Sequence, residues 1–238
     1  MGAMCGRYAT TRNAGDLSAL FESVDSTGEV GPDYNVAPTD RAPLVRLAPE
    51  GHRLLSLGRW GLLPSWSRSA SGAARMINAR AETIATSRAY APSFARRRCL
   101  VPADGWYEWV RRPDGGRQPY FMTPRDGSVL ALAGIWSVWE SAGSARLTFS
   151  VLTTAALGEL AEVHDRMPLL LPRERWAAWL GPTDEPAALL VPPDAGQLAG
   201  LEIRPVSPAV GDVRNDGPEL IARVVPEGAE AGAEPTLF

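Results

Sequence analysis

Residues 99–152 decide the fold, and they read CLVPADGWYEWVRRPDGGRQPYFMTPRDGSVLALAGIWSVWESAGSARLTFSVL. Five apolar runs in this stretch are rich in β-branched and aromatic residues, and short segments of Gly, Asp and Pro separate them. The runs are Cys99–Val101, Trp106–Val110, Tyr120–Met122, Leu130–Val138 and Leu147–Leu152. Short runs joined by turns of this kind predict successive strands of an antiparallel sheet.

The sequence before this stretch adds further extended segments. We expect them at Tyr34–Pro38, Pro43–Leu47 and Arg53–Leu57, after a short helix at Asp16–Ser23 whose Leu and Phe residues share one face. Strands therefore dominate the first third of the chain.

Flanking residues predict three more helices. They are Arg80–Tyr90, which Pro92 would end, Thr154–Val163 with Thr154 as its N-cap, and Pro172–Leu180, which Gly181 closes. The fold class expected is α+β, a single domain over residues 4–225 with a mixed, largely antiparallel β-sheet core flanked by short helices. Residues 226–238 are acidic and rich in Ala, Gly and Pro, which predicts a disordered tail.

Composition excludes several classes of function. The 238 residues include 23 Gly and 21 Pro, which favours many short elements over a coiled coil. All 24 basic residues are Arg, so lysine Schiff-base chemistry and a P-loop lysine are excluded. The chain has two Cys and two His, and they show neither CxxC nor HxxxH spacing, so it offers few ligands for a metal site. We expect neither a metal nor another cofactor.

The chain also lacks the signals of export or membrane insertion. No apolar run approaches the roughly 18 residues that span a bilayer, and the first residues contain no apolar h-region. Only Cys5 and Cys99 are available for a disulfide. We expect a cytoplasmic protein of bacterial type that acts as a monomer away from membranes.

Positive charge gathers in the middle of the chain although the net charge is −3. Residues 51–117 contain 12 Arg and four acidic residues, interleaved with seven of the aromatic residues. Arginines for phosphates and rings for unpaired bases are what a groove for single-stranded nucleic acid requires. The alternative is a solvated arginine face over an aromatic core.

Cys5 follows an internal methionine, Met4, that can serve as a start codon. Removal of that methionine would leave Cys5 with a free α-amine beside its thiol, and both groups have reactive forms near neutral pH. Such a pair can convert an aldehyde first to an imine and then to a five-membered thiazolidine ring. The alternative is a buried structural cysteine.

Two further residues are candidates for proton transfer. His164 lies past a predicted helix end and before a proline, where a loop can present it as acid or base, or where it is simply hydrogen-bonded. Glu108 shares a strand face with Trp106, while Tyr107 and Trp109 face the other way. Its carboxylate is either desolvated among rings, which suits proton transfer, or lies exposed on an edge strand.

Asn78 and Cys99 are weaker candidates. Asn78 can orient a polar group, but an Asn before a predicted helix is usually an N-cap. Cys99 follows three arginines, yet its apolar neighbours favour an inert thiol in a strand core.

Seven segments, taken together and in order, resemble the SRAP family of SOS response-associated peptidases, or abasic-site processing proteins. They are MCGRY, YNVAP, WGLLPSW, MINARAET, DGWYEW, VHDRMPLLL and PVSPAVGDVRNDGPELI, and they run from residue 4 to about residue 221. The resemblance implies a mixed α+β fold on a β-sheet core. It also implies covalent capture of abasic sites in single-stranded DNA, including its junctions with duplex, together with thiol autopeptidase and lyase-type activity.

The resemblance further implies a role for each matching residue. Cys5 would crosslink to the ring-opened sugar, Asn78 would place the sugar and the Cys5 amine, and Glu108 would act as acid and base. His164 would assist proton transfer and crosslink reversal. The residues implied to contact or lie beside DNA are Arg7, Asn35, Pro38, Trp66, Arg80, Arg88 and Arg166.

The sequence differs from the family pattern in two places, and two other functions remain open as alternatives. Some relatives carry consecutive tryptophans where this chain has Trp66-Ser67, which would weaken base stacking. The residues Met1-Gly2-Ala3-Met4 would block the Cys5 amine unless they are removed, for example by self-cleavage. The alternatives are a cysteine peptidase that acts on other proteins and a noncatalytic module that binds single-stranded DNA.

Overall fold

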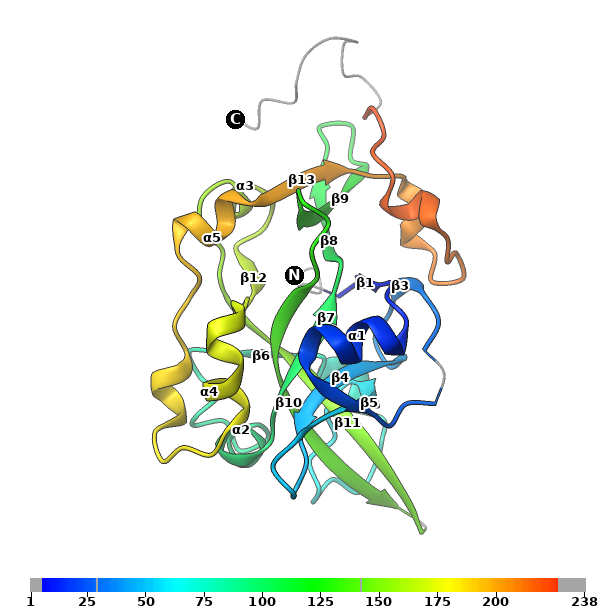
Figure 1. The fold of residues 1–238 in the computed structure, drawn as a ribbon. Coiled ribbons are helices and arrows are strands. Elements are labelled where there is room, and N and C mark those ends of the chain that lie inside the picture. The colour runs from blue at the N-terminus through cyan, green and yellow to red at the C-terminus, as the bar shows by residue number, and fades with distance from the viewer. Residues whose placement is uncertain (1–5, 29, 142, 227–238) are drawn as a thin grey trace.

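Five strands close on themselves to form the barrel around which the chain is built. The computed structural model describes residues 6–28, 30–141 and 143–226 (Figure 1). In order around the barrel the strands are β5 (Arg53–Trp60), β4 (Arg41–Leu47), β7 (Arg98–Ala103), β10 (Leu130–Ser141) and β11 (Ser144–Ala155). Each neighbouring pair is antiparallel except β11 and β5, which close the barrel in parallel.

Side chains of the barrel strands alternate between the interior of the barrel and its outer surface. One apolar cluster includes Leu44, Cys99 and Phe149, and a second includes the intervening residues Val45 and Leu100. A Cβ added to Gly134 of β10 would lie 2.8 Å from the sulfur of Cys99, so the strands approach too closely there for a larger residue. Helices α1 (Ala14–Phe21), α2 (Ala91–Arg96) and α4 (Trp176–Leu180) pack on the second cluster.

A second sheet lies against one end of the barrel, in the upper half of Figure 1. Its order is β13 (Leu201–Pro205), β9 (Arg117–Pro124), β8 (Gly105–Arg111), β1 (Tyr8–Thr10) and β3 (Asp33–Val36). One face contributes Tyr8, Trp106 and Met122 to the cluster inside the barrel. The other face packs on the 3₁₀ helices η4 (Pro208–Gly211) and η5 (Pro218–Ile221).

The remaining elements are short. Strand β2 (Ser23–Asp25) pairs with β5, whereas β6 (Asn78–Arg80) and β12 (Arg166–Pro168) both pair with β11. Helices α3 (Leu160–Val163) and α5 (Ala195–Ala199) and three 3₁₀ turns, η1 (Ala73–Arg75), η2 (Arg173–Arg175) and η3 (Pro186–Leu189), complete the described fold. The predicted α+β class with a mixed, largely antiparallel core is confirmed. None of the helices in the described ranges is long and apolar enough to cross a membrane.

Two predicted helices are wrong. Residues 81–90 form successive turns, and the helix begins at Ala91 with Pro92 in its first turn, where a missing N–H costs nothing. Pro92 therefore starts a helix that it was expected to end. Thr154 lies inside β11, and the helix that follows has only four residues with Glu159 before it.

The other expected helices are present with shifted ends. The first begins at Ala14 and ends at Phe21, because the side chain of Asn13 caps it by accepting from the Asp16 N–H. The helix expected at Pro172–Leu180 consists of η2 followed by α4, and it ends at Gly181 as predicted.

Candidate functional site

Glu108 lies in the interior of the second sheet. Strand β8 runs between β9 and β1, and the Glu108 side chain is only 3% exposed, so the edge-strand alternative is wrong. The predicted alternation is confirmed, because Trp106 packs inside the barrel cluster while Tyr107 packs on the opposite face. Glu108 is thus a buried carboxylate on the barrel side of the sheet.

Strand β1 leads the beginning of the described chain toward Glu108. Tyr8 pairs with Trp106, and the Tyr107 N–H donates to the Arg7 carbonyl at 3.0 Å. Continuing this antiparallel register places Gly6 beside Glu108. Cys5, the predicted nucleophile, precedes Gly6 in the chain and lies outside the described residues.

Asn78 belongs to strand β6, so the N-cap interpretation is wrong. Its strand runs parallel to β11, with Asn78 opposite Val151. The Tyr90 hydroxyl donates to the Asn78 carbonyl at 3.0 Å, and burial raises the pKa of Tyr90 to about 12, which keeps that hydroxyl protonated as a donor. Pairing with β11 and the hydrogen bond from Tyr90 therefore both hold the backbone of Asn78 in place.

Trp60 links the segment of Asn78 to the segment of Glu108. Its indole N–H donates to the Ile77 carbonyl at 2.9 Å, one residue before Asn78. Its ring meets the Tyr8 ring edge-on, with centroids 5.0 Å apart, and Tyr8 pairs with Trp106 two residues before Glu108. Sequence reasoning did not single out Trp60 or Tyr8 as members of this arrangement, because neither carries reactive chemistry.

His164 follows α3 directly and is presented at the end of β11. The C-terminal part of β11 has β6 on one edge and β12 on the other, so Thr153 pairs with both Arg80 and Pro168. The Arg166 N–H donates to Nδ1 of His164 at 3.0 Å. Nδ1 accepts this bond only in the neutral tautomer that carries its proton on Nε2. The Asp165 carboxylate, 2.9 Å from Nδ1, forms an ion pair only with the protonated ring.

Arg166 is held by a carboxylate that sequence reasoning missed. Its guanidinium donates to both oxygens of Glu82, at 2.6 and 2.8 Å, and to the Thr153 carbonyl at 2.7 Å. These hydrogen bonds hold the pKa of Glu82 below its usual range. Glu82 therefore competes with any phosphate for the positive charge of Arg166. Glu82 lies in the quoted segment MINARAET, but its distant partner was not deducible from spacing.

Trp66 and Arg88, both predicted to contact DNA, lie together at the surface. The Trp66 ring is 57% exposed, and the Arg88 guanidinium carbon lies 5.3 Å from its centroid. The Trp139 indole N–H donates to the Ser67 carbonyl at 2.7 Å and so anchors the loop that presents the ring. An exposed ring beside a cation is an arrangement that can stack a base and contact a phosphate. Arg80 is also exposed, at the end of β6.

Arg7 and Asn35 belong to a hydrogen-bond network that connects β1, β3 and the C-terminal loop. Arg7 donates to the side-chain oxygen of Asn35 at 2.6 Å and to the Val210 carbonyl at 2.9 Å. Burial lowers the pKa of Arg7, and the nearby carboxylate of Asp40 opposes that shift. Asn35 is only 3% exposed and donates to the carbonyls of Asp212 and Asn215. In this structure both residues join β1 and β3 to the C-terminal loop.

Pro38 lies in the tight turn that follows β3. Ala37 N–H donates to the Asp40 carboxylate, and Thr39, with a φ of 80°, donates its N–H to the Trp60 carbonyl at 2.8 Å. The turn therefore bonds Thr39, the residue after Pro38, to the backbone of Trp60. Cys99, by contrast, is fully buried inside the barrel, and burial raises the pKa of its thiol, which confirms the interpretation as an inert core residue.

Comparisons with known proteins agree on one family. The model of the family described as SOS response associated peptidase (SRAP) matches residues 4–213. The abasic site processing protein YedK of Escherichia coli is 34% identical over 228 residues, covering 93% of this chain and all of that protein. The abasic site processing protein YoqW of Bacillus subtilis is 33% identical, covering 92% of this chain and 99% of that one. A solved structure from Bacteroides thetaiotaomicron has the same fold, with a TM-score of 0.79 at 24% identity over 93% of this chain and 100% of that chain.

Proposed function

Because this chain belongs to the SRAP family, we propose that it processes abasic sites in DNA by capturing them covalently through Cys5. The observation that carries the proposal is the convergence of three chain segments. Strand β1, which follows Cys5 in the chain, pairs with the strand that carries Glu108, and Trp60 links β1 to the segment of Asn78. Strand β11 has β6 with Asn78 on one edge and β12, which follows His164, on the other.

The reaction proposed is a condensation without oxidation or reduction. An abasic deoxyribose opens to an aldehyde, and the α-amine of Cys5 adds to its carbonyl carbon. The resulting carbinolamine loses water to give an imine, and the Cys5 thiolate then adds to the imine carbon while the nitrogen takes up a proton. One water leaves overall, and the product is a thiazolidine that joins the protein to the strand.

Glu108 supplies the proton transfers that this sequence needs. Ring opening moves a proton from the anomeric hydroxyl to the ring oxygen, and loss of water needs a proton delivered to the departing hydroxyl. A carboxyl group can do both in turn. Its burial beside β1, at 3% exposure, excludes bulk water as a competing proton donor.

His164 and Asn78 have polar groups suited to the sugar. In the tautomer that carries its proton on Nε2, His164 can donate to a sugar oxygen or to the crosslink. Crosslink reversal would break the C–S bond with a proton taken up by the departing sulfur, and water would then add to the imine carbon and release the Cys5 amine. The Asn78 amide can both donate and accept hydrogen bonds, which suits a role in orienting the sugar and the Cys5 amine. The position of Asn78 beside β11, and of His164 two residues before β12 on the other edge, supports both proposed roles.

The proposed partner is single-stranded DNA, including its junctions with duplex. Arg80 and Arg88 are exposed or partly exposed cations that can contact phosphates, and the exposed ring of Trp66 can stack on a base. Arg166 can join them by exchanging Glu82 for a phosphate. We propose that the protein acts as a monomer in the cytoplasm and associates with the nucleoid when the DNA is damaged.

Capture requires a free α-amine on Cys5, so residues 1–4 must leave first. We propose that Cys5 removes them itself as a thiol autopeptidase. Its sulfur would attack the Met4 carbonyl carbon, the Cys5 nitrogen would leave with a proton, and water would hydrolyse the thioester. The products are a peptide ending in a carboxylate and Cys5 with its amine and thiol restored.

A denaturing gel tests the proposal. Protein beginning at Cys5 is mixed with a strand that carries one abasic site, beside the Cys5→Ala variant and beside an intact strand. We expect a shifted band only for Cys5 protein with the abasic strand. Loss of all shift with Cys5→Ala while binding persists separates capture from simple binding. Absence of a shift for the Cys5 form leaves the noncatalytic binding module and the peptidase as the alternatives.

A further inference from the structure

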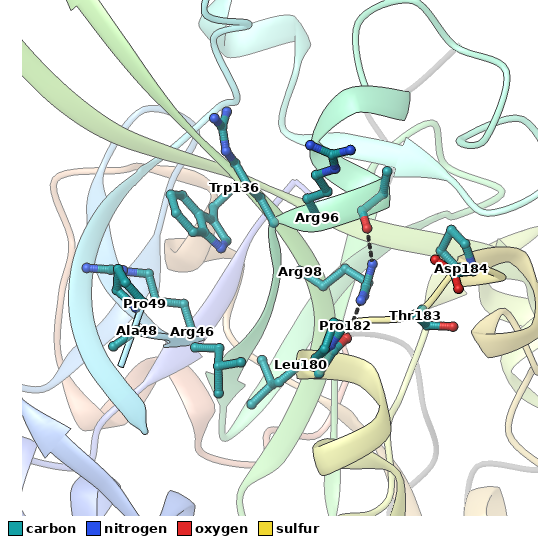
Figure 2. A pocket seen from close by; sticks show the side chains of 15 residues that line it. Arg46, Ala48, Pro49, Arg96, Arg98, Trp136, Leu180, Pro182, Thr183 and Asp184 are labelled. Carbon is teal, nitrogen blue, oxygen red and sulfur yellow. Dashed lines mark hydrogen bonds between the residues drawn. The ribbon is translucent and has the colours of Figure 1, made fainter. Parts of the chain in front are cut away.

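A cavity of about 790 Å³ opens on the barrel outside the candidate site (Figure 2). The ends of β4 and α2, strand β10 and the loop after α4 surround it, and none of the predicted catalytic or DNA-contacting residues lines it. Four arginines line it against a single carboxylate, that of Asp184. Apolar atoms of Leu47, Pro49 and Leu180 make up much of the remaining wall. Its size and mixed lining are typical of sites for small ligands.

One of the four arginines is structural. Arg98 is 3% exposed and donates to the carbonyls of Phe94 and Ala95 at the end of α2, at 2.8 and 2.7 Å. It also donates to the carbonyls of Trp179 and Gly181 at the end of α4, at 2.7 and 2.5 Å. Arg98 thus uses four of its five N–H groups to neutralise the negative ends of both helices and to fix the cavity wall.

The other arginines are held but not neutralised. Arg46 and Arg97 both stack on Trp136, with guanidinium carbons 5.1 and 5.7 Å from the ring centroid. Stacking occupies the flat face of a guanidinium and leaves its in-plane N–H groups available. Within residues 6–28, 30–141 and 143–226, no carboxylate lies at ion-pair distance from Arg46, Arg96 or Arg97.

Charge and geometry therefore favour an anion with a flat or apolar body. Arg46 is half-buried, and its one hydrogen bond with a described side chain is from Nε to the Ser56 hydroxyl at 3.2 Å. Burial lowers the pKa of Arg46, since its charge is partly withheld from water, and a bound anion would offset that cost. Carboxylate and phosphate both match the geometry of a guanidinium, and phosphate is the one with enough oxygens and charge to serve two arginines at once.

We infer that this arginine and tryptophan cavity binds a nucleotide phosphate, and that the phosphate belongs to the same DNA strand that occupies the proposed capture site. The inference rests on the proposed function. Helix α2 connects the two places: the Tyr90 hydroxyl before it bonds the Asn78 carbonyl, and Arg96 and Arg97 at its end face the cavity. The six residues of α2 span about 9 Å, so a strand that follows this helix needs about three nucleotides to pass along it.

The test follows the Trp136 indole N–H resonance of the full chain in nitrogen-15 NMR spectra, assigned with the Trp136→Phe variant. The probes are thymidine 5′-monophosphate, thymidine without phosphate, and an intact oligothymidylate strand. The variant tested is Arg97→Gln, at an exposed position. The matched control is Arg173→Gln, another exposed arginine stacked on a tryptophan, with its guanidinium carbon 5.9 Å from the Trp176 ring and outside the cavity.

We expect the monophosphate and the strand, but not thymidine, to shift the Trp136 resonance. Arg97→Gln should weaken binding of both by about tenfold and reduce the salt slope of strand binding by about 0.7, while Arg173→Gln changes neither. A shift by the monophosphate alone would overturn the strand assignment in favour of a free nucleotide. No shift by either phosphate probe, or equal losses in variant and control, would overturn the site. Since no probe contains an abasic site, these results do not depend on covalent capture.

Discussion

Replacing Glu82 with Gln should weaken the fold and strengthen DNA binding at the same time. Glu82 holds the Arg166 guanidinium through two hydrogen bonds of 2.6 and 2.8 Å. If Arg166 contacts phosphate, the Glu82 carboxylate competes with the DNA for its guanidinium. Gln keeps the size and one acceptor oxygen but removes the charge.

The magnitude follows from the exposure of the pair. The Arg166 side chain is 12% exposed, but that of Glu82 is 49% exposed, so solvent screens much of their attraction. We expect the variant to lose about 1 kcal/mol of unfolding free energy, or about 2–4 °C in Tm. In the variant, the ion pair no longer competes with phosphate binding. Its loss of about 1 kcal/mol corresponds to about fivefold tighter binding of an intact single strand.

The pH dependence has a defined sign. Because Arg166 holds the pKa of Glu82 below its usual range, the stabilisation is complete above the ordinary carboxyl pKa of about 4.3. It disappears as the pH falls through the lowered value in the folded protein. The stability difference between Glu82→Gln and the parent should therefore be present at neutral pH and vanish in acid.

Fluorescence anisotropy with an intact single strand and thermal unfolding at several pH values measure these effects. Glu22→Gln is the matched control, since Glu22 also pairs with an arginine, Arg173, at 2.6 Å and is 60% exposed. We expect the control to leave DNA affinity unchanged. Weaker DNA binding by Glu82→Gln, equal to that of Arg166→Ala, would refute the reasoning and show that the pair is purely structural.

Three other changes have defined outcomes. Glu108→Gln should slow crosslinking more than it weakens binding, because a buried amide cannot exchange protons, and equal losses in gel and anisotropy assays would mean a structural role. Arg80→Ala should weaken strand binding and reduce its salt slope by about 0.7, and an unchanged slope in a salt titration would remove Arg80 from the DNA groove. Trp66→Ala should cost about 1–3 kcal/mol of strand affinity without lowering Tm, since the ring is 57% exposed; a lowered Tm at unchanged affinity would show that the ring only packs.

The sequence predicted the strands of residues 99–152 well because their signals are local. Each apolar run alternates or is continuous over a few residues, and Gly, Asp and Pro mark its ends. The observed strands extend the predicted runs by one to several residues at most ends, for example from Leu130–Val138 to Leu130–Ser141. Extension follows from pairing, since β10 and β11 continue together to their hairpin.

The failures occur where a distant partner decides the local structure. Asn78–Arg80 has helix-compatible residues, but it pairs with β11 more than 70 positions later in the chain. Glu82 and Arg166 are likewise 84 positions apart. Arg98 looks like a solvated cation in the run Arg96–Arg98, yet four backbone carbonyls satisfy it in the interior. No spacing rule reveals partners at such separations.

For the candidate site, the residue types could be predicted from the sequence, but their arrangement in space depends on the fold. Cys5, Glu108 and His164 carry chemistry that the sequence alone reveals, whereas the positions of Glu108 on β8 and of His164 before β12 depend on strand pairings. Whether Cys5 reacts as proposed stays a prediction, because it lies outside the described residues.

The most direct test is the intact mass of the product formed by protein beginning at Cys5 and a strand with one abasic site. We expect a species that weighs one water less than the protein and strand together and that resists borohydride reduction, as a closed thiazolidine should. The same mass converted by borohydride to a species with two more hydrogens would indicate an imine without thiol addition. A product that persists in Cys5→Ala, or the absence of any covalent product, would contradict capture through Cys5.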